Sequence, residues 1–208
     1  MIVPPSPPLD AIVIGGSAGA LEPLLGLVAA LPPSVTAPLV VVMHLHPSFP
    51  SLVPSLLARA DGRPAREVED KEPLTAGTVH VAPPDYHLLI ERGGRLALSL
   101  ELPVMFSRPS IDVLFESAAA ALGPRVCGVL LSGSNADGAA GLAAIAAAGG
   151  RVFVQADAQF PTMPEAGRTR ASATAVPAAE LARALAALAP RADRAPGPAH
   201  PPETRHEP

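Results

Sequence analysis

Short apolar runs alternate with segments of helical periodicity along most of the chain. Residues 11–14 (AIVI) and 39–43 (LVVVM) are continuous apolar runs rich in β-branched residues, which predicts two buried strands. Between them, apolar residues recur every three or four positions over 21–31, and the two prolines that follow end the predicted helix.

The later part of the chain continues this alternation after a polar, turn-rich stretch at 61–105, where Gly93-Gly94 predicts the turn of a hairpin. Pro109 opens a helix whose apolar stripe runs from Ile111 to Leu122. Further strands are predicted at 78–82, 86–90, 95–100, 126–131 (VCGVLL), 151–155 and near Val176, and further helices at about 137–148 and 178–189.

This order of elements predicts an α/β fold: a doubly wound, mostly parallel sheet with helices on both faces, and a small β-hairpin region. Of the 27 prolines, four lie in residues 1–8 and six in residues 190–208, and prolines at this density oppose packing. We therefore expect a flexible N-terminal segment at 1–8, a folded domain at 9–189 and a disordered, proline-rich tail at 190–208.

Composition narrows the function classes. With 15 Lys and Arg against 19 Asp and Glu, 3% aromatic residues and no Trp, the chain lacks the surface typical of nucleic-acid binding or anionic membranes. Residues 23–58 carry no charge, but prolines interrupt them, so we expect no membrane segment. A lone cysteine, Cys127, excludes an internal disulfide and a multi-cysteine zinc site, and fits a cytoplasmic location.

Three polar residues lie at the exits of predicted strands: Ser17 after the first strand, His44 after the second and Asp137 after the VCGVLL strand. Ligands and reacting groups gather at these ends of parallel strands, and the three residues supply a nucleophile, a base and an orienting carboxylate. Free N–H groups after Ser17, including that of Ala18, could stabilise an oxyanion.

Each of the three also has a simpler interpretation. Ser17 in GGSAGA could cap a helix or belong to a phosphate cradle, although G-x-G-x-x-G is absent. His44 could be structural or could pair with His46 on a metal, but no third ligand follows from local spacing, so no metal site is predicted. Asn135 or Asp137 could serve as a helix cap.

Other candidates favour structural roles. Cys127 lies within an apolar run and indicates core packing. His80 and His87 flank a Pro-Pro-Asp turn, where a surface or structural role is expected. Asp112 is interpreted as a first-turn charge favoured by the helix dipole.

Six segments, taken in order over about residues 10–189, resemble the catalytic domain of the CheB-type chemotaxis protein-glutamate methylesterases. They are AIVIGGSAGALEPL, VVVMHLHPSFPSLVPSLL, AGTVHVAPPDYHLLI, SRPSIDVLFESAA, VCGVLLSGSNADGAAGL and VFVQADAQFPTMPEAG. The resemblance implies a Ser-His-Asp triad at Ser17, His44 and Asp137. It also gives the backbone near Ala18 and Ser134 an oxyanion or substrate-positioning role, where the family often has a methionine at the position of Ser134.

The same resemblance implies hydrolysis of glutamate γ-methyl esters, with deamidation of glutamine, on the cytoplasmic helices of methyl-accepting chemoreceptors. No metal or organic cofactor is expected. The first strand begins near Met1, so we expect a stand-alone catalytic domain without the family's usual phospho-receiver domain, and a separate response regulator or methyltransferase is an open partner. A hydrolase of another ester or amide, and a non-catalytic signalling module that binds a receptor, are the alternatives.

Overall fold

The computed structural model describes residues 9–44 and 51–188. The segments predicted to be flexible at 1–8 and disordered at 190–208 lie outside these described residues. No helix within the described ranges combines the length and the apolar character needed to cross a bilayer.

A seven-stranded parallel sheet forms the centre of the molecule, with the strand order β3-β4-β2-β1-β7-β8-β9. An antiparallel hairpin of β5 and β6 forms a second, two-stranded sheet. The predicted fold class is therefore confirmed. The strands are β1 (Ala11–Gly16), β2 (Leu39–Met43), β3 (Ala65–Glu67), β4 (Val79–Val81), β5 (His87–Glu91), β6 (Arg95–Ser99), β7 (Val126–Leu130), β8 (Arg151–Gln155) and β9 (Thr174–Val176).

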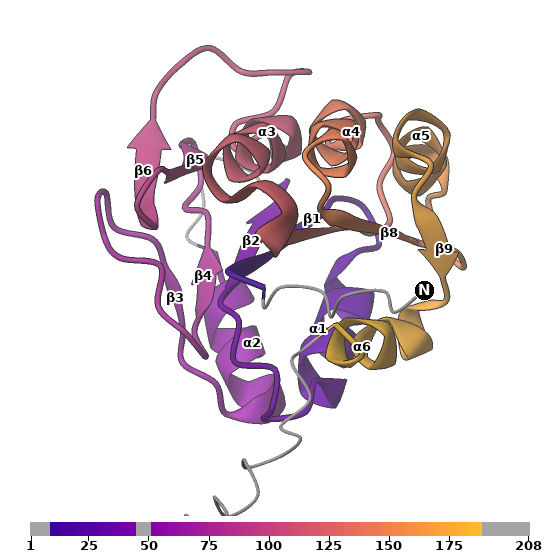
Figure 1. Cartoon of the computed structure of the whole chain (residues 1–208), viewed down its shortest axis with the longest axis horizontal. Helices are drawn as coiled ribbons and strands as arrows, with labels where there is room; N and C mark the ends of the chain where they lie inside the picture. The colour runs from indigo at the N-terminus through magenta and orange to yellow at the C-terminus, as the bar shows by residue number, and fades with distance from the viewer. Residues whose placement is uncertain (1–8, 45–50, 189–208) are drawn as a thin grey trace, which may run out of the picture.

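Helices cover both faces of the large sheet, α3, α4 and α5 on one and α1, α2 and α6 on the other (Figure 1). Their bounds are α1 (Leu21–Ala30), α2 (Val53–Asp61), α3 (Ile111–Leu122), α4 (Ala139–Ala147), α5 (Thr162–Ala171) and α6 (Ala178–Ala186), and a short 3₁₀ turn spans Gly123–Arg125. Side chains alternate along β1, so that Val13 joins the core under α3 and Ile14 joins the core over α1.

Three elements were not predicted from the sequence. β3 is a half-exposed edge strand with the sequence ARE, so it lacks the apolar run that marks the inner strands. α5 has many polar residues and contains Pro164 and Gly167, which oppose a helix prediction. Both Pro164 and Gly167 are buried in the structure. α2 is short and begins at a proline-containing turn.

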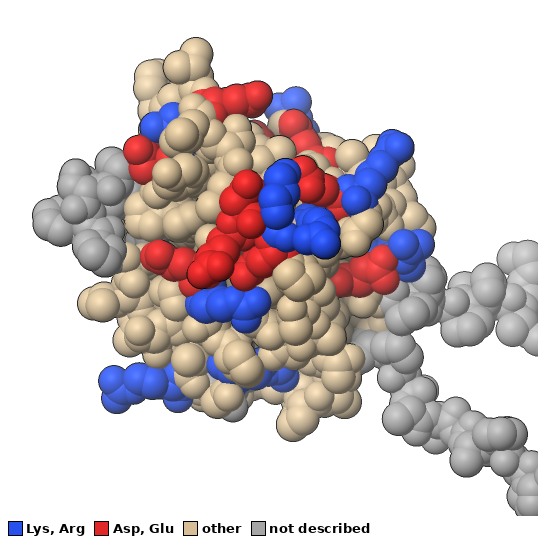
Figure 2. All heavy atoms as spheres, turned by 90° about the vertical axis from the view of Figure 1, so that its left-hand side faces the viewer, with Lys and Arg blue, Asp and Glu red and all other residues tan. Residues whose placement is uncertain are grey.

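The charged residues of β3, the β5–β6 hairpin and the segment between them gather on one edge of the molecule (Figure 2). Arg66 pairs with Glu72, and Lys71 pairs with Glu91. The Lys71–Glu91 pair is exposed on both sides and contributes little to stability, whereas Glu72 is only 12% exposed and also bonds the buried His80.

The end of β1 brings α3 close to the sheet because β1 ends in glycine. A Cβ on Gly15 would lie 2.3 Å from Cγ2 of Ile111, the first residue of α3. The missing side chain therefore lets the N-terminus of α3 pack directly on the strand end, beside Ser17.

We predict that Gly15→Ala lowers the free energy of unfolding by about 1–3 kcal/mol, because the added methyl group must displace Ile111. Gly26→Ala in α1 is the matched control: a Cβ there meets nothing within 4 Å, and alanine is the better helix former. Urea unfolding of both variants measures the difference, and equal stability of the two would contradict the packing argument.

Candidate active site

Ser17 and His44 lie next to each other at the ends of two neighbouring strands. Gly16 of β1 pairs in register with Met43 of β2, so the following residues are Ser17 and His44. The backbone N–H of His44 donates to the Gly16 carbonyl oxygen at 3.1 Å, which continues the strand pairing. Asp137 lies between β7, on the other side of β1, and α4, so all three residues lie at the same edge of the sheet.

His44 and Asp137 form a hydrogen-bonded pair. Nε2 of His44 lies 2.7 Å from Oδ2 of Asp137, whose side chain is fully buried. A carboxylate can only accept, so Nε2 carries the proton in the neutral ring and Nδ1 is left as the acceptor nitrogen. The pairing thus orients the ring and fixes its tautomer, which are the two tasks of the carboxylate in a nucleophile-activating site.

Three further donors hold the Asp137 carboxylate. Oδ1 accepts from the Ser110 hydroxyl at 2.8 Å and from the Asp112 N–H at 3.0 Å, while Oδ2 also accepts from the Ile111 N–H at 2.8 Å. Asp137 therefore satisfies the free N–H groups at the N-terminus of α3, across the loop, and does not cap α4, the helix that follows it. The alternative interpretation, in which Asn135 or Asp137 caps the helix that follows, finds no support, because α4 has no side-chain cap hydrogen bond.

Burial by itself raises the pKa of Asp137, but the hydrogen bonds from His44, from the two backbone N–H groups and from Ser110 outweigh it. The net result is a pKa below the ordinary value. Asp137 is thus held as a carboxylate that stabilises a positive charge on His44.

Asp112 makes the reciprocal contact. It is buried in the first turn of α3, and its Oδ1 accepts the N–H of Gly141 in α4 at 2.7 Å. Desolvation raises its pKa, and the Asp137 charge adds to the rise, against the hydrogen bonds from Gly141 and Gly138. Asp112 thus has a specific structural role beyond the dipole effect expected from the sequence.

The turn that carries Ser17 is held by Ser132, a residue that sequence reasoning did not single out. The Ser17 N–H donates to the Ser132 carbonyl oxygen at 2.9 Å, and the Ser132 hydroxyl donates to the Ala18 carbonyl oxygen at 2.8 Å. Ser132 is fully buried at the end of β7. Its position directly after the apolar VCGVLL run is the signal that could have found it.

Among the described residues, Ser17 Oγ makes no hydrogen bond to His44, and Nδ1 instead faces the hydroxyl of Ser107 at 3.4 Å. Within the same ranges the backbone N–H groups of Ala18 and Ser134 have no hydrogen-bond partner. Both N–H groups are therefore available to an oxyanion, and Ser107 is a second hydroxyl beside the base that the sequence analysis missed.

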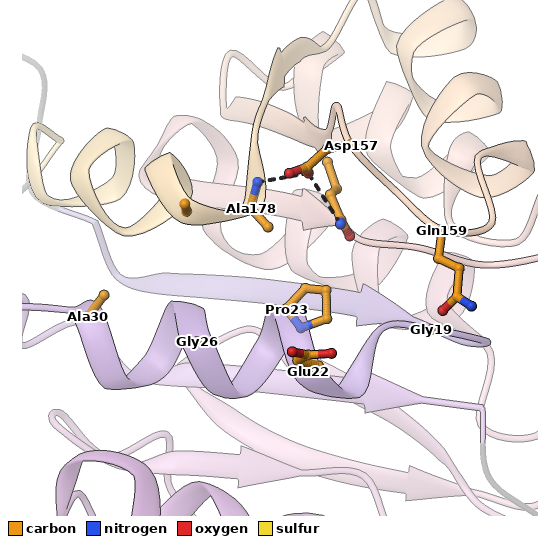
Figure 3. A pocket seen from close by; sticks show the side chains of 10 residues that line it. Gly19, Glu22, Pro23, Gly26, Ala30, Asp157, Gln159 and Ala178 are labelled. Carbon is orange, nitrogen blue, oxygen red and sulfur yellow. Dashed lines mark hydrogen bonds between the residues drawn. The ribbon is translucent and has the colours of Figure 1, made fainter.

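Two depressions flank these residues. A pocket of about 170 Å³ is lined by His44, Asp85, Pro103 and the segment 106–109. A wider groove of about 580 Å³ begins at Gly19 and runs along α1, with Glu22 on one wall and Asp157 on the other (Figure 3). The smaller pocket contains the base, and its size suits one extended side chain rather than a drug-sized molecule, which needs about 300–1,000 Å³.

The remaining candidates are structural. His80 is fully buried, with Nδ1 2.9 Å from Oε1 of Glu72, and desolvation lowers its pKa. His87 is also buried. Burial raises the pKa of the Cys127 thiol, which keeps it protonated within β7.

The structure adds no evidence for the alternative in which His44 and His46 hold a metal. No group of three or more His, Cys, Asp or Glu side chains in the described ranges has a metal-binding arrangement, and His46 lies outside those ranges.

Comparison with known proteins agrees with this geometry. The family model described as CheB methylesterase matches residues 12–185. A Leptospira interrogans protein named as a protein-glutamate methylesterase/protein-glutamine glutaminase is 40% identical over 169 residues, which cover 80% of this chain and 86% of that protein. Protein-glutamate methylesterase/protein-glutamine glutaminase 1 of Paramagnetospirillum magneticum is 36% identical over 194 residues, which cover 90% of this chain but 51% of that protein.

The fold is also similar to a solved structure. The crystal structure of the Thermotoga maritima CheB methylesterase catalytic domain superposes with a TM-score of 0.82 at 27% identity, covering 86% of this chain and 98% of that one. The two chains therefore share the arrangement of the sheet and helices over nearly the whole of the solved domain.

We predict that Asp137→Asn lowers the free energy of unfolding by about 3 kcal/mol at about pH 7, and by less at about pH 3. The folded-state pKa of Asp137 lies below 3.8, so its stabilising effect is present above that value and is lost as the pH falls through the folded pKa. Urea unfolding at the two pH values measures this, and an equal loss at both would contradict it.

Asp112→Asn is the matched control, with the opposite sign. The folded-state pKa of Asp112 is raised, so its ionisation destabilises the fold only as the pH rises through that pKa. Relative to wild type, Asp112→Asn should therefore be more favourable at about pH 7 than at about pH 3, since asparagine keeps an oxygen for the Gly141 N–H.

Proposed function

The chain belongs to the CheB methylesterase family, and on that premise we propose that it is a serine esterase that hydrolyses glutamate γ-methyl esters on the cytoplasmic domains of chemoreceptors. The observation that carries the proposal is the His44–Asp137 pair beside Ser17, with Nδ1 of His44 left as the acceptor. The names of the relatives, protein-glutamate methylesterase/protein-glutamine glutaminase, supply the substrate class.

In the proposed mechanism Ser17 is the nucleophile. Its Oγ attacks the ester carbonyl carbon, and its proton passes to Nδ1 of His44, so the ring becomes an imidazolium. Asp137 stabilises that positive charge through Nε2 at 2.7 Å without taking the proton itself. His44 then returns the proton to the departing methoxide oxygen, which leaves as methanol, and a water molecule attacks the acyl-enzyme by the same route in reverse.

The oxyanion formed in each step needs donors near Ser17. The backbone N–H groups of Ala18 and Ser134 are our candidates, because both are free of partners among the described residues. One well-aimed donor contributes about 3–4 kcal/mol to stabilisation of the transition state. None of these steps uses a metal or an organic cofactor.

Deamidation of glutamine follows the same path. The amide carbonyl replaces the ester carbonyl, and His44 protonates a departing amine instead of methoxide, so the products are ammonia and a glutamate. Because the amine leaves less readily, we expect this reaction to be slower than ester hydrolysis.

The proposed substrate also indicates the partner and the location of this domain. Methyl-accepting chemoreceptor helices on the cytoplasmic side are the proposed partner, which places this domain in the cytoplasm during the adaptation step of chemotaxis. The folded unit is proposed to span residues 9–189, close to the range matched by the family. A separate response regulator or methyltransferase is a further proposed partner, and a methyltransferase would form the esters that this domain hydrolyses.

We predict that Ser17→Ala and His44→Ala each lower methanol release from a methylated receptor fragment by at least about a thousandfold, because each removes a group that bonds to or transfers a proton from the reacting atoms. Release of radiolabelled methanol measures the rate. Covalent labelling of Ser17 by a fluorophosphonate probe, located by peptide mass spectrometry, gives an independent readout of the nucleophile.

Ser107→Ala is the matched control, since Ser107 is the other hydroxyl beside Nδ1 of His44. We expect this variant to keep activity within about tenfold of wild type and to be labelled at Ser17. Labelling at residue 107 in the wild-type protein, or near-normal turnover by Ser17→Ala, would assign the nucleophile to Ser107 and contradict the proposal.

A further inference from the structure

The loop that joins β6 to α3, residues 100–110 (the β6–α3 loop), exposes large apolar side chains. Phe106 is fully exposed at 103%, Leu102 is 85% exposed and Leu100 is 62% exposed. In Figure 1 the loop rises above the layer of α3, and the projection at the top of Figure 2 is mostly uncharged. Apolar groups gathered on a protrusion are typical of a contact surface rather than of a solvated one.

The tip of this loop is a strained two-residue turn. Val104 and Ser107 exchange backbone hydrogen bonds at 3.1 and 2.9 Å, and the two residues between them, Met105 and Phe106, both have positive φ (48° and 65°). Turns of this kind favour Asn-Gly, because other side chains are strained in the left-handed region. The chain thus maintains two bulky apolar residues in an unfavourable backbone conformation, which is the pattern of a functional contact.

Both sides of the turn are anchored, so Phe106 is held in place. Arg108 donates to the Asp85 carboxylate at 2.7 Å and to the carbonyl oxygens of Leu100 and Glu101 at 3.0 and 3.1 Å. His87 is buried; its Nδ1 accepts the Ser110 N–H at 3.1 Å, so its Nε2 carries the proton and donates to the Leu102 carbonyl oxygen at 3.1 Å.

The turn also adjoins the reacting groups. Phe106 lines the pocket of about 170 Å³ that contains His44, and the next residue, Ser107, faces Nδ1 of His44 at 3.4 Å. A polypeptide whose side chain enters this pocket therefore comes close to Phe106.

We propose that Phe106 is a specificity-determining residue that contacts apolar side chains next to the esterified glutamate on a helical protein substrate. The inference rests on the proposed function and deepens it. A phenyl ring with no charge is recognised by an apolar surface, so the occupant is a helix that presents apolar residues about one turn from the glutamyl ester. A small free ester presents no such apolar helix surface to Phe106.

The test compares two substrates on the full chain: a receptor cytoplasmic fragment carrying radiolabelled methyl esters, and p-nitrophenyl acetate. Phe106→Ala should lower the ratio of kcat/KM for the fragment to kcat/KM for the aryl ester by at least about tenfold, through KM for the fragment. The double variant Met105→Asn/Phe106→Gly should lower the same ratio as much while raising the urea midpoint, because it relieves the strain. Leu102→Ala removes another highly exposed apolar side chain from the same loop and should leave the ratio within about twofold.

The outcomes separate the two proposals. If wild type releases no methanol from the fragment, the proposed function fails, and the inference fails with it. If wild type releases methanol and Phe106→Ala keeps the ratio, only the role of Phe106 is overturned. An equal fall with Leu102→Ala overturns it as well, because the contact then belongs to the loop as a whole.

Discussion

The buried carboxylate of Asp137 is the interaction on which the site depends. Four donors from two parts of the chain meet at its two oxygens: the imidazole of His44 after β2, and the Ser110 hydroxyl with the two N–H groups that open α3. A buried charge is tolerated only when its hydrogen bonds are complete, so this carboxylate requires α3, β2 and the β7–α4 loop to meet at one point. Orientation of the base is thus a consequence of how the fold satisfies one charge.

A second hydrogen bond joins α3 and α4 near Asp137: Asp112 in α3 accepts the N–H of Gly141 in α4. Asp137, ahead of α4, accepts from the N–H groups of α3, and Asp112, in α3, accepts from an N–H group of α4. The first turn of α3 therefore donates to a carboxylate in the loop before α4, and the first turn of α4 donates to a carboxylate in α3. Burial raises the pKa of Asp112, and the nearby Asp137 charge adds to that rise, whereas the larger set of hydrogen-bond donors around Asp137 outweighs its burial and lowers its pKa.

Much of this fold was predictable because the inner strands are apolar on both faces. The runs at β1, β2 and β7 predicted the sheet, and the turns that follow these strands contain Ser17, His44 and Asp137. β3 and α5 were missed because an exposed edge strand and a polar helix with Pro164 carry no such pattern. Pairings across the sheet were also hidden: nothing in a linear pattern indicates that Asp137 would cap α3 rather than α4, or that Ser107 would face His44.

The site and the β6–α3 loop are built from different kinds of interaction, and this separates chemistry from recognition. The Asp137 carboxylate is held by two backbone N–H groups, which any residue except proline can supply, and by the Ser110 hydroxyl. The β6–α3 loop is held by the side chain of Arg108, while the side chains of Met105 and Phe106 at its tip make no hydrogen bond to Asp137. Substitutions at Met105 and Phe106 can therefore change which polypeptides are bound without disturbing the orientation of His44. The buried His87 bridges the two parts, since it accepts from Ser110 and donates to Leu102, and it fixes the distance between the recognition surface and the base.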